Sequence, residues 1–196
     1  MKRYDCLKAI APIFTNELVV TSVGAVRAEW HSLRPSDANL HLSNLGLASS
    51  VGLGLALTLP HRKVVVFDGD GSVLANLASL TTIANQNPKN LVHIVFDNSA
   101  YESSKGLQTA TSGVTDLALM AKGAGIKNSY STDNLEEFES LASAALRGND
   151  VTFILAKVEY WAANVPPTTF DALEKKYKFI RHIEETEKIS IQTVLI

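Results

Sequence analysis

VVVFDGDGS, the stretch from Val64 to Ser72, joins a buried-strand pattern to a loop that is rich in glycine and aspartate. Its first four residues are apolar with no polar alternation, which is typical of a strand covered on both faces of a sheet. Apolar residues then recur at helical spacing after Val73 and stop near Asn87-Pro88, where proline prevents a helix from continuing. The stretch therefore predicts a strand, a tight loop and a helix in immediate succession.

The same alternation of strand and helix continues on both sides of this stretch. Similar apolar runs predict strands at residues 18–21, 91–96 and 151–156, and a shorter one at 126–130. Apolar spacing predicts further helices at residues 45–59, 114–122 and 135–146. This order predicts an α/β fold, a single three-layer domain whose mainly parallel sheet carries helices on both faces. Because ligands bind such sheets beyond the carboxyl ends of the strands, we expect function just after Phe67 and just after Phe96.

The pattern changes towards the end of the chain. We expect residues 1–165 to form the domain and residues 166–196 to form a helical appendage, which opens at Pro166-Pro167 and runs as a charged helix from Asp171 to Lys188. The apolar side chains expected to dock this helix on the domain or on a partner are Tyr177, Phe179, Ile180 and Ile183. The lysines expected to face water are Lys175, Lys176 and Lys178.

The composition is that of one globular domain, with 196 residues of which 46% are hydrophobic and 19% charged. A net charge of −2 provides no broad positive field, so we expect no nucleic-acid partner. The single cysteine, Cys6, excludes a disulfide framework and favours a reducing compartment, by default the cytoplasm. The N-terminal residues lack a signal-like apolar run, and the stretch from Leu45 to Leu59 is too short to span a bilayer, so no membrane association is expected.

The loop after the first quoted strand has the chemistry of a phosphate site. Its glycines let the backbone come close to a ligand, and the free amides at the start of the next helix favour phosphate oxygens. Asp70 adds a carboxylate there, and two neighbouring anions require a divalent cation such as Mg²⁺. An ordinary capped turn is the alternative for the loop taken alone. Neither a dinucleotide-binding nor a P-loop motif is present at this point.

A second polar loop, Asp97-Asn98-Ser99-Ala100-Tyr101, follows the next strand. A right-handed crossover between parallel strands brings their ends together, so the Asn98 side chain and the Ala100 carbonyl can face the cation held by Asp70. Alone, this segment would more often be a plain turn. Paired with Asp70, it indicates a metal-bridged diphosphate.

These two loops resemble the diphosphate motif of thiamine diphosphate (ThDP)-dependent enzymes, which begins with Gly-Asp-Gly and ends in Asn. Here the motif runs from Gly69-Asp70-Gly71 to Asn98. The segments 45–57 and 97–103 are similar to the sulfopyruvate and phosphonopyruvate decarboxylase branch of the family. The resemblance covers residues 2–158 and implies the ThDP-binding fold.

The resemblance also implies a role for each matching residue. Asp70 and Asn98 would ligate Mg²⁺ by their side chains and Ala100 by its carbonyl, while Gly71 and Ser72 would contact the diphosphate. Leu45 would hold the cofactor in its bent form, and Ser43 and Gly24 would lie beside the aminopyrimidine. The implied cofactor-binding residues are Gly24, Ser43, Leu45, Gly69, Asp70, Gly71, Ser72, Asn98, Ala100 and Tyr101. The segment Ser103 to Gln108 departs from the family pattern by an apparent extra residue.

The family takes the Glu that activates ThDP from a separate pyrimidine-binding domain, and one βα domain has no room for it. The resemblance therefore implies a hetero-oligomer in which a pyrimidine-domain (alpha) subunit completes the active site and this chain alone is inactive. The reaction implied is decarboxylation of a small 2-oxo acid, whose identity the sequence leaves open. The candidate cations for an anionic substrate tail are Arg27, His31, His41 and Lys105.

Two other functions remain open at this stage. A ThDP-dependent carboligase or oxidoreductase subunit would share every cofactor-binding residue and would differ only in what it does with the decarboxylated substrate. A non-catalytic subunit could keep the ThDP pocket for assembly alone, although such a subunit would have no need for metal ligands.

Overall fold

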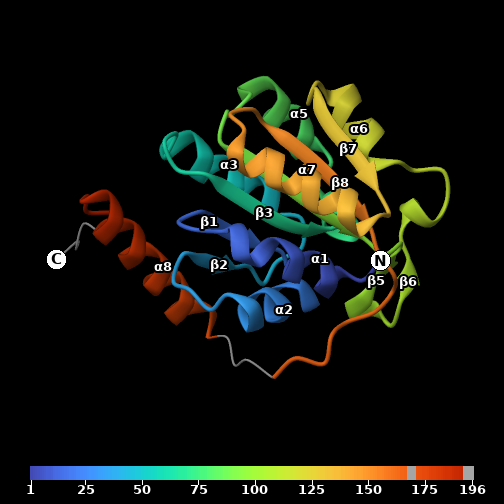
Figure 1. The fold of residues 1–196 in the computed structure, drawn as a ribbon, viewed down its shortest axis with the longest axis horizontal. Coiled ribbons are helices and arrows are strands. Elements are labelled where there is room, and N and C mark those ends of the chain that lie inside the picture. The colour runs from blue at the N-terminus through green and yellow to red at the C-terminus, as the bar shows by residue number, and fades with distance from the viewer. Residues whose placement is uncertain (167–170, 192–196) are drawn as a thin grey trace.

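A six-stranded sheet forms the centre of the computed structural model, which describes residues 1–166 and 171–191 (Figure 1). The strands lie in the order β2-β1-β3-β4-β8-β7, and every neighbouring pair is parallel. Their bounds are β1 Leu18–Thr21, β2 Asn39–His41, β3 Val64–Gly69, β4 Leu91–Asp97, β7 Asn128–Thr132 and β8 Thr152–Lys157. A separate antiparallel pair joins β5 (Ala100–Tyr101) to β6 (Leu107–Gln108). Strands β3 and β4 are buried along almost their whole length, as expected for a sheet with both faces covered.

Helices cover both faces of the sheet, which gives the predicted three layers. Two separate apolar clusters fill the spaces between the layers: α1, α2 and α7 contribute to one, and α3, α5, α6 and α8 to the other. The bounds of the helices are α1 Arg3–Ile10, α2 Ala25–Leu33, α3 Ala48–Thr58, α4 Asp70–Ala75, α5 Ala78–Gln86, α6 Leu117–Ala124, α7 Leu135–Arg147 and α8 Ala172–Glu187. Three short 3₁₀ helices are η1 Ala11–Ile13, η2 Glu102–Ser104 and η3 Ala110–Ser112. The α/β fold class is confirmed.

Several element boundaries differ from the sequence-based expectations. The helix expected from Val73 onwards begins at Asp70 and is broken into α4 and α5 around Asn76, whose amide donates to the Gly46 carbonyl at 2.8 Å. The helix expected from Val114 begins at Leu117, because the Asp116 carboxylate caps it by accepting from two first-turn amides. The strand expected at 126–130 lies two residues later, and the helix expected from Leu45 begins at Ala48. The sequence did not predict α1, α2 or β2.

The C-terminal helix α8 packs against the edge strand β2 (Figure 1). Phe179 and Ile183 are each only 4% exposed and belong to the same apolar cluster as β1 and β3, so they dock the helix on the domain as expected. Tyr177 is more exposed, Lys176 and Lys178 face water as predicted, and Lys175 is half-buried. Residues 167–170 and 192–196 of the expected appendage, including Pro167, lie outside the described residues.

Helix α3 approaches β3 closely through Gly52. A Cβ atom at Gly52 would lie 2.2 Å from Cγ2 of Val66, which is fully buried in the core. We expect Gly52→Ala to lower the free energy of unfolding by about 1–3 kcal/mol, because overpacking outweighs the roughly 1 kcal/mol by which alanine favours a helix over glycine. Urea unfolding followed by circular dichroism measures this change.

Gly54 in the same helix is the matched control. It is exposed, and a Cβ atom there would meet nothing within 4 Å. Gly54→Ala should therefore raise the free energy of unfolding by about 0.5–1 kcal/mol. Equal effects of the two substitutions would contradict the close approach of α3 to β3.

Candidate cofactor and metal site

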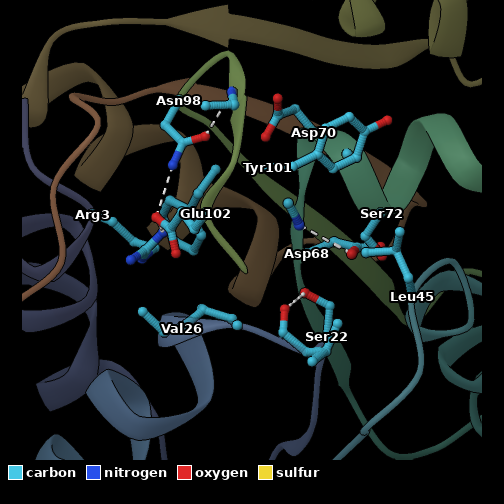
Figure 2. Close-up of a pocket in the computed structure, with 17 residues that line it drawn as sticks. Arg3, Ser22, Val26, Leu45, Asp68, Asp70, Ser72, Asn98, Tyr101 and Glu102 are labelled. Carbon is cyan, nitrogen blue, oxygen red and sulfur yellow. Dashed lines mark hydrogen bonds and ion pairs between the residues drawn. The ribbon is translucent and has the colours of Figure 1, made fainter. Parts of the chain in front are cut away.

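A cavity opens at the carboxyl ends of β1, β3 and β4 (Figure 2). Thr21 at the end of β1 pairs with Phe67 in β3, and Gly69 at the end of β3 pairs with Phe96 in β4, so the loops after these strands meet at one edge of the sheet. Strand β1 pairs with β2 on one side and β3 on the other, which makes this edge a point where the strand order reverses. Parallel α/β sheets bind ligands at such points.

The start of α4 forms one wall of this cavity. Gly69 is the N-cap residue and no side chain caps the helix, so the amides of its first turn lack a side-chain acceptor. The ring of Tyr101 packs directly on Gly71, where a Cβ atom would lie 2.3 Å from the ring. Gly71 therefore allows the β4–β5 loop to close on the start of α4.

Asp70 is a buried carboxylate in this first turn, only 2% exposed. Its Oδ2 accepts from the Thr109 hydroxyl at 2.5 Å, and the Thr111 hydroxyl, 2.8 Å from that of Thr109, donates to Asp97 at 2.7 Å. Burial raises the pKa of Asp70, and the nearby Asp97 charge raises it further, although the Thr109 hydrogen bond acts in the opposite direction. A carboxylate in this environment is stabilised by a nearby cation.

Asn98 lies opposite Asp70 on the loop after β4, and both side chains border the cavity (Figure 2). Its Oδ1 accepts from the Ala100 amide at 3.1 Å, and its Nδ2 donates to Glu102 Oε1 at 2.7 Å. Ser99 takes a positive φ of 58° in this tight turn. The Asn98 side chain is therefore held by its own loop, with a second lone pair on Oδ1 left for another partner.

Arg3 and Glu102 line the same cavity and form an ion pair. Arg3 Nη1 donates to Glu102 Oε1 at 2.7 Å, and its Nε donates to Glu29 Oε2 at 2.6 Å. Arg3 is 4% exposed and Glu29 is fully buried. The two carboxylates raise the pKa of Arg3 against the effect of its burial. The guanidinium thus ties α1 to α2 and to the loop after β4.

Asp68, which lines the cavity, forms a buried pair with His93 across the neighbouring strands β3 and β4. His93 Nε2 lies 3.2 Å from Asp68 Oδ2, and Asp68 Oδ1 accepts from the Gly69 amide at 3.0 Å. This pair fixes the backbone at the end of β3, just before Asp70.

The segment around Leu45 lines the cavity beside the start of α4 (Figure 2). The Gly46 amide donates to the Ser72 hydroxyl at 3.1 Å, and the Asn76 amide donates to the Gly46 carbonyl at 2.8 Å. Both bonds tie the segment to the region of α4. Leu45 is 47% exposed and lines the cavity, which is unusual for a large apolar side chain inside a domain. It presents an apolar surface to whatever occupies the cavity.

Nine of the ten residues expected to bind the cofactor border this one cavity, from three separate loops and the Leu45 segment. They are Gly24, Leu45, Gly69, Asp70, Gly71, Ser72, Asn98, Ala100 and Tyr101. Ser43 is exposed and does not line it. The three expected metal ligands, Asp70, Asn98 and Ala100, are all among the nine.

The cations expected to hold an anionic substrate tail do not line the cavity. None of Arg27, His31, His41 and Lys105 borders it. Burial lowers the pKa of His41 to about 3, and its Nδ1 bonds with the Thr21 hydroxyl at 2.9 Å. The cation that does line it is Arg3, which sequence reasoning missed because an arginine in the first turn of an amphipathic helix carries no motif.

Threonines 109 and 111 were missed for a related reason. They reach Asp70 through the turn around β6, after the segment where the sequence departs from the family pattern. Only the folded loop brings them to the site. Across residues 1–166 and 171–191, no three His, Cys, Asp or Glu side chains gather as a metal centre.

Residues 23–156 match the family described as thiamine pyrophosphate enzyme, C-terminal TPP binding domain. The chain belongs to this family. Thiamine pyrophosphate is another name for ThDP, so the family predicted from the two loops is confirmed. The chain is 37% identical over 187 residues to the protein named sulfopyruvate decarboxylase subunit beta of Methanocaldococcus jannaschii, and this match covers 94% of the chain and 98% of that relative.

Other relatives are longer than this chain. It is 35% identical over 148 residues to phosphonopyruvate decarboxylase of Streptomyces viridochromogenes, a match that covers 75% of the chain and 37% of the relative. The structure of benzoylformate decarboxylase from Polynucleobacter necessarius superposes with a TM-score of 0.69 over 86% of this chain and 34% of that one. At 19% identity this likeness shows the fold alone. In the described part of the chain, no helix is long and apolar enough to cross a membrane.

Proposed function

We propose that the chain is the ThDP- and Mg²⁺-binding subunit of a two-chain 2-oxo acid decarboxylase of the sulfopyruvate or phosphonopyruvate type. The observation that carries the proposal is the gathering of Asp70, Asn98 and Ala100 around one cavity beside the uncapped start of α4. The names of the sulfopyruvate and phosphonopyruvate decarboxylase relatives support the choice of reaction.

The donor set suits Mg²⁺. Carboxylate, amide and carbonyl oxygens are hard ligands, and Mg²⁺ is usually held by one or two carboxylates together with phosphate oxygens of a ligand and water. Asp70 would be the charged ligand, and a cation beside it would offset the burial and the Asp97 charge that raise its pKa. Asn98 Oδ1 has a second lone pair, and the Ala100 carbonyl would supply the third oxygen.

The remaining cavity residues suit the other parts of ThDP. The Gly71 amide and Ser72 hydroxyl at the start of α4 would hold the diphosphate, and Leu45 would support the bent cofactor from below. Gly24 would lie along the pyrimidine side. When bound, ThDP supplies an electron sink for the electrons released with CO₂ from a 2-oxo acid. The residues of this chain would bind and orient the cofactor.

The pyrimidine ring also needs a carboxylate, and those that line the cavity already have partners. Asp68 bonds with His93, Asp70 accepts from Thr109, and Glu102 pairs with Arg3. We therefore infer that the activating carboxylate comes from a pyrimidine-domain (alpha) subunit in a hetero-oligomer. The name subunit beta, carried by a relative of nearly equal length, supports this inference.

The test is to measure CO₂ release from sulfopyruvate and from phosphonopyruvate with ThDP and Mg²⁺, using this chain alone and mixed with a partner subunit that carries the pyrimidine-domain Glu. We expect turnover only from the mixture, with a rate at least 10²-fold above that of either chain, because general acid–base groups contribute on the order of 10²–10⁴-fold. Analysis of the organic product separates the candidates: an aldehyde supports decarboxylation, and a carbon–carbon coupled product supports a carboligase. Cofactor uptake without turnover would indicate an assembly subunit.

A further inference from the structure

The amide of Asn98 can point either its oxygen or its nitrogen at a metal, and only the oxygen can ligate one. The two orientations have nearly the same shape, so the surrounding hydrogen bonds must decide between them. In the structure Nδ2 donates to Glu102 Oε1 at 2.7 Å, and Oδ1 accepts from the Ala100 amide at 3.1 Å. An ionised carboxylate is an acceptor only, so Glu102 can face the nitrogen but not the oxygen.

Glu102 is itself held by a buried cation. Arg3 Nη1 donates to the same Oε1 atom at 2.7 Å, and Arg3 is fixed from the other side by Glu29, which is fully buried. Figure 2 shows Arg3 and Glu102 side by side, with Asn98 above them at the edge of the cavity. The guanidinium holds the Glu102 carboxylate in place. A chain of contacts thus runs from α1 to the amide of Asn98.

We propose that Glu102, fixed by Arg3, is a positioning residue that orients the Asn98 amide with its oxygen towards the metal position. This inference rests on the proposed function, because it assigns a role to residues next to the proposed Mg²⁺ ligand. Groups that orient metal ligands in this way typically change metal affinity by about 10–100-fold when they are removed. Arg3 lies outside residues 23–156, the part of the chain that matches the family.

Glu102→Gln is the most informative substitution. It keeps the size of the side chain but removes the charge that pairs with Arg3. A neutral amide accepts less strongly from the Asn98 nitrogen than a carboxylate does, and it can also turn to donate to the Asn98 oxygen, so the preference is weakened. Titration of Mg²⁺ by calorimetry, in the presence of ThDP and the partner subunit, should show an affinity about 10–100-fold weaker than that of the wild-type protein. Glu139→Gln, which removes the same charge from an exposed position on α7, should leave the affinity unchanged.

A double-mutant cycle separates positioning from a general structural effect. In an Asn98→Ala background, Glu102→Gln should change Mg²⁺ affinity by less than about twofold, because its effect acts only through Asn98. Side-chain amide NMR signals of the chain without cofactor provide a second readout. The Asn98 signal should show a strong hydrogen bond to a carboxylate in the wild-type protein, and Glu102→Gln should shift it.

The outcomes distinguish this inference from the proposed function. If the wild-type protein binds Mg²⁺ with ThDP and Glu102→Gln binds it equally well, the positioning role is wrong and the proposed function stands. An effect of Glu102→Gln that is as large without Asn98 as with it would also overturn the role. If the wild-type protein takes up no Mg²⁺ beside ThDP and the partner, both proposals fail. Should Glu102→Gln not fold, the wild-type NMR signal still decides whether a carboxylate holds the amide.

Discussion

Asp70→Ala should abolish Mg²⁺-dependent binding of ThDP and reduce CO₂ release by at least 10³-fold. Asp70 is the charged member of the proposed ligand set, and Asn98 and Ala100 offer only neutral oxygens. Without Asp70, the proposed ligand set would contain no carboxylate to hold the cation beside the diphosphate. Because Mg²⁺ releases its bound water reluctantly, the neutral oxygens that remain would bind it poorly. Calorimetry with ThDP and Mg²⁺ measures the binding, and a CO₂ assay with the partner subunit measures the rate.

Asp133→Ala is a suitable control, because this substitution removes the same charge from an exposed position in the connection between β7 and α7. It should bind ThDP and Mg²⁺ like the wild-type protein. Circular dichroism should show that the Asp70 variant remains folded, since a buried carboxylate with a raised pKa does not favour the folded state. Undiminished turnover of the folded Asp70 variant would remove the metal assignment.

The strands and the site loops were predictable because they depend on local patterns. A run such as Val64 to Phe67, without polar alternation, has few alternatives to a buried strand. The loops after β3 and β4 meet because parallel crossovers bring strand ends together, and this rule needs no side-chain detail. The sequence therefore predicted that these two loops meet at one edge of the sheet.

What could not be predicted depends on contacts between distant parts of the chain. Strand β2 has three residues, Asn39–His41, with no apolar run, and it forms only because β1 offers an open edge. The break between α4 and α5 follows from contacts of Asn76 with the Leu45 segment, 30 positions away. Arg3 reaches Glu102 across 99 positions. No local pattern carries such information.

The same limit explains why the four candidate cations do not line the cavity. Arg27, His31, His41 and Lys105 were selected by charge alone, and charge does not say which way a side chain faces. In the folded chain, the cation at the cavity is Arg3, and two carboxylates already engage it. A cation that neutralises two carboxylates is a weak site for a further anion.

Arg3→Met should lower the free energy of unfolding by about 3–5 kcal/mol, the cost of leaving one member of a buried ion pair without its partner. Arg3 donates to both oxygens of Glu29, at 2.6 and 3.2 Å, and both side chains are almost completely shielded from water. Without Arg3, the Glu29 carboxylate keeps only the Ala163 amide, at 2.8 Å. Urea unfolding measures the loss, and the melting temperature should fall by on the order of 10 °C.

A second substitution and a surface pair test the physical reason for this loss. Glu29→Gln in the Arg3→Met background should recover much of it, because it removes the stranded charge and keeps an acceptor for the Ala163 amide. Lys89 and Asp150 form a pair of similar length, 2.8 Å, with side chains 53% and 61% exposed. Lys89→Met should therefore lower the free energy of unfolding far less than Arg3→Met does. If the losses at Arg3 and Lys89 were equal, Glu29 would have to be accessible to water, contrary to its burial in the structure.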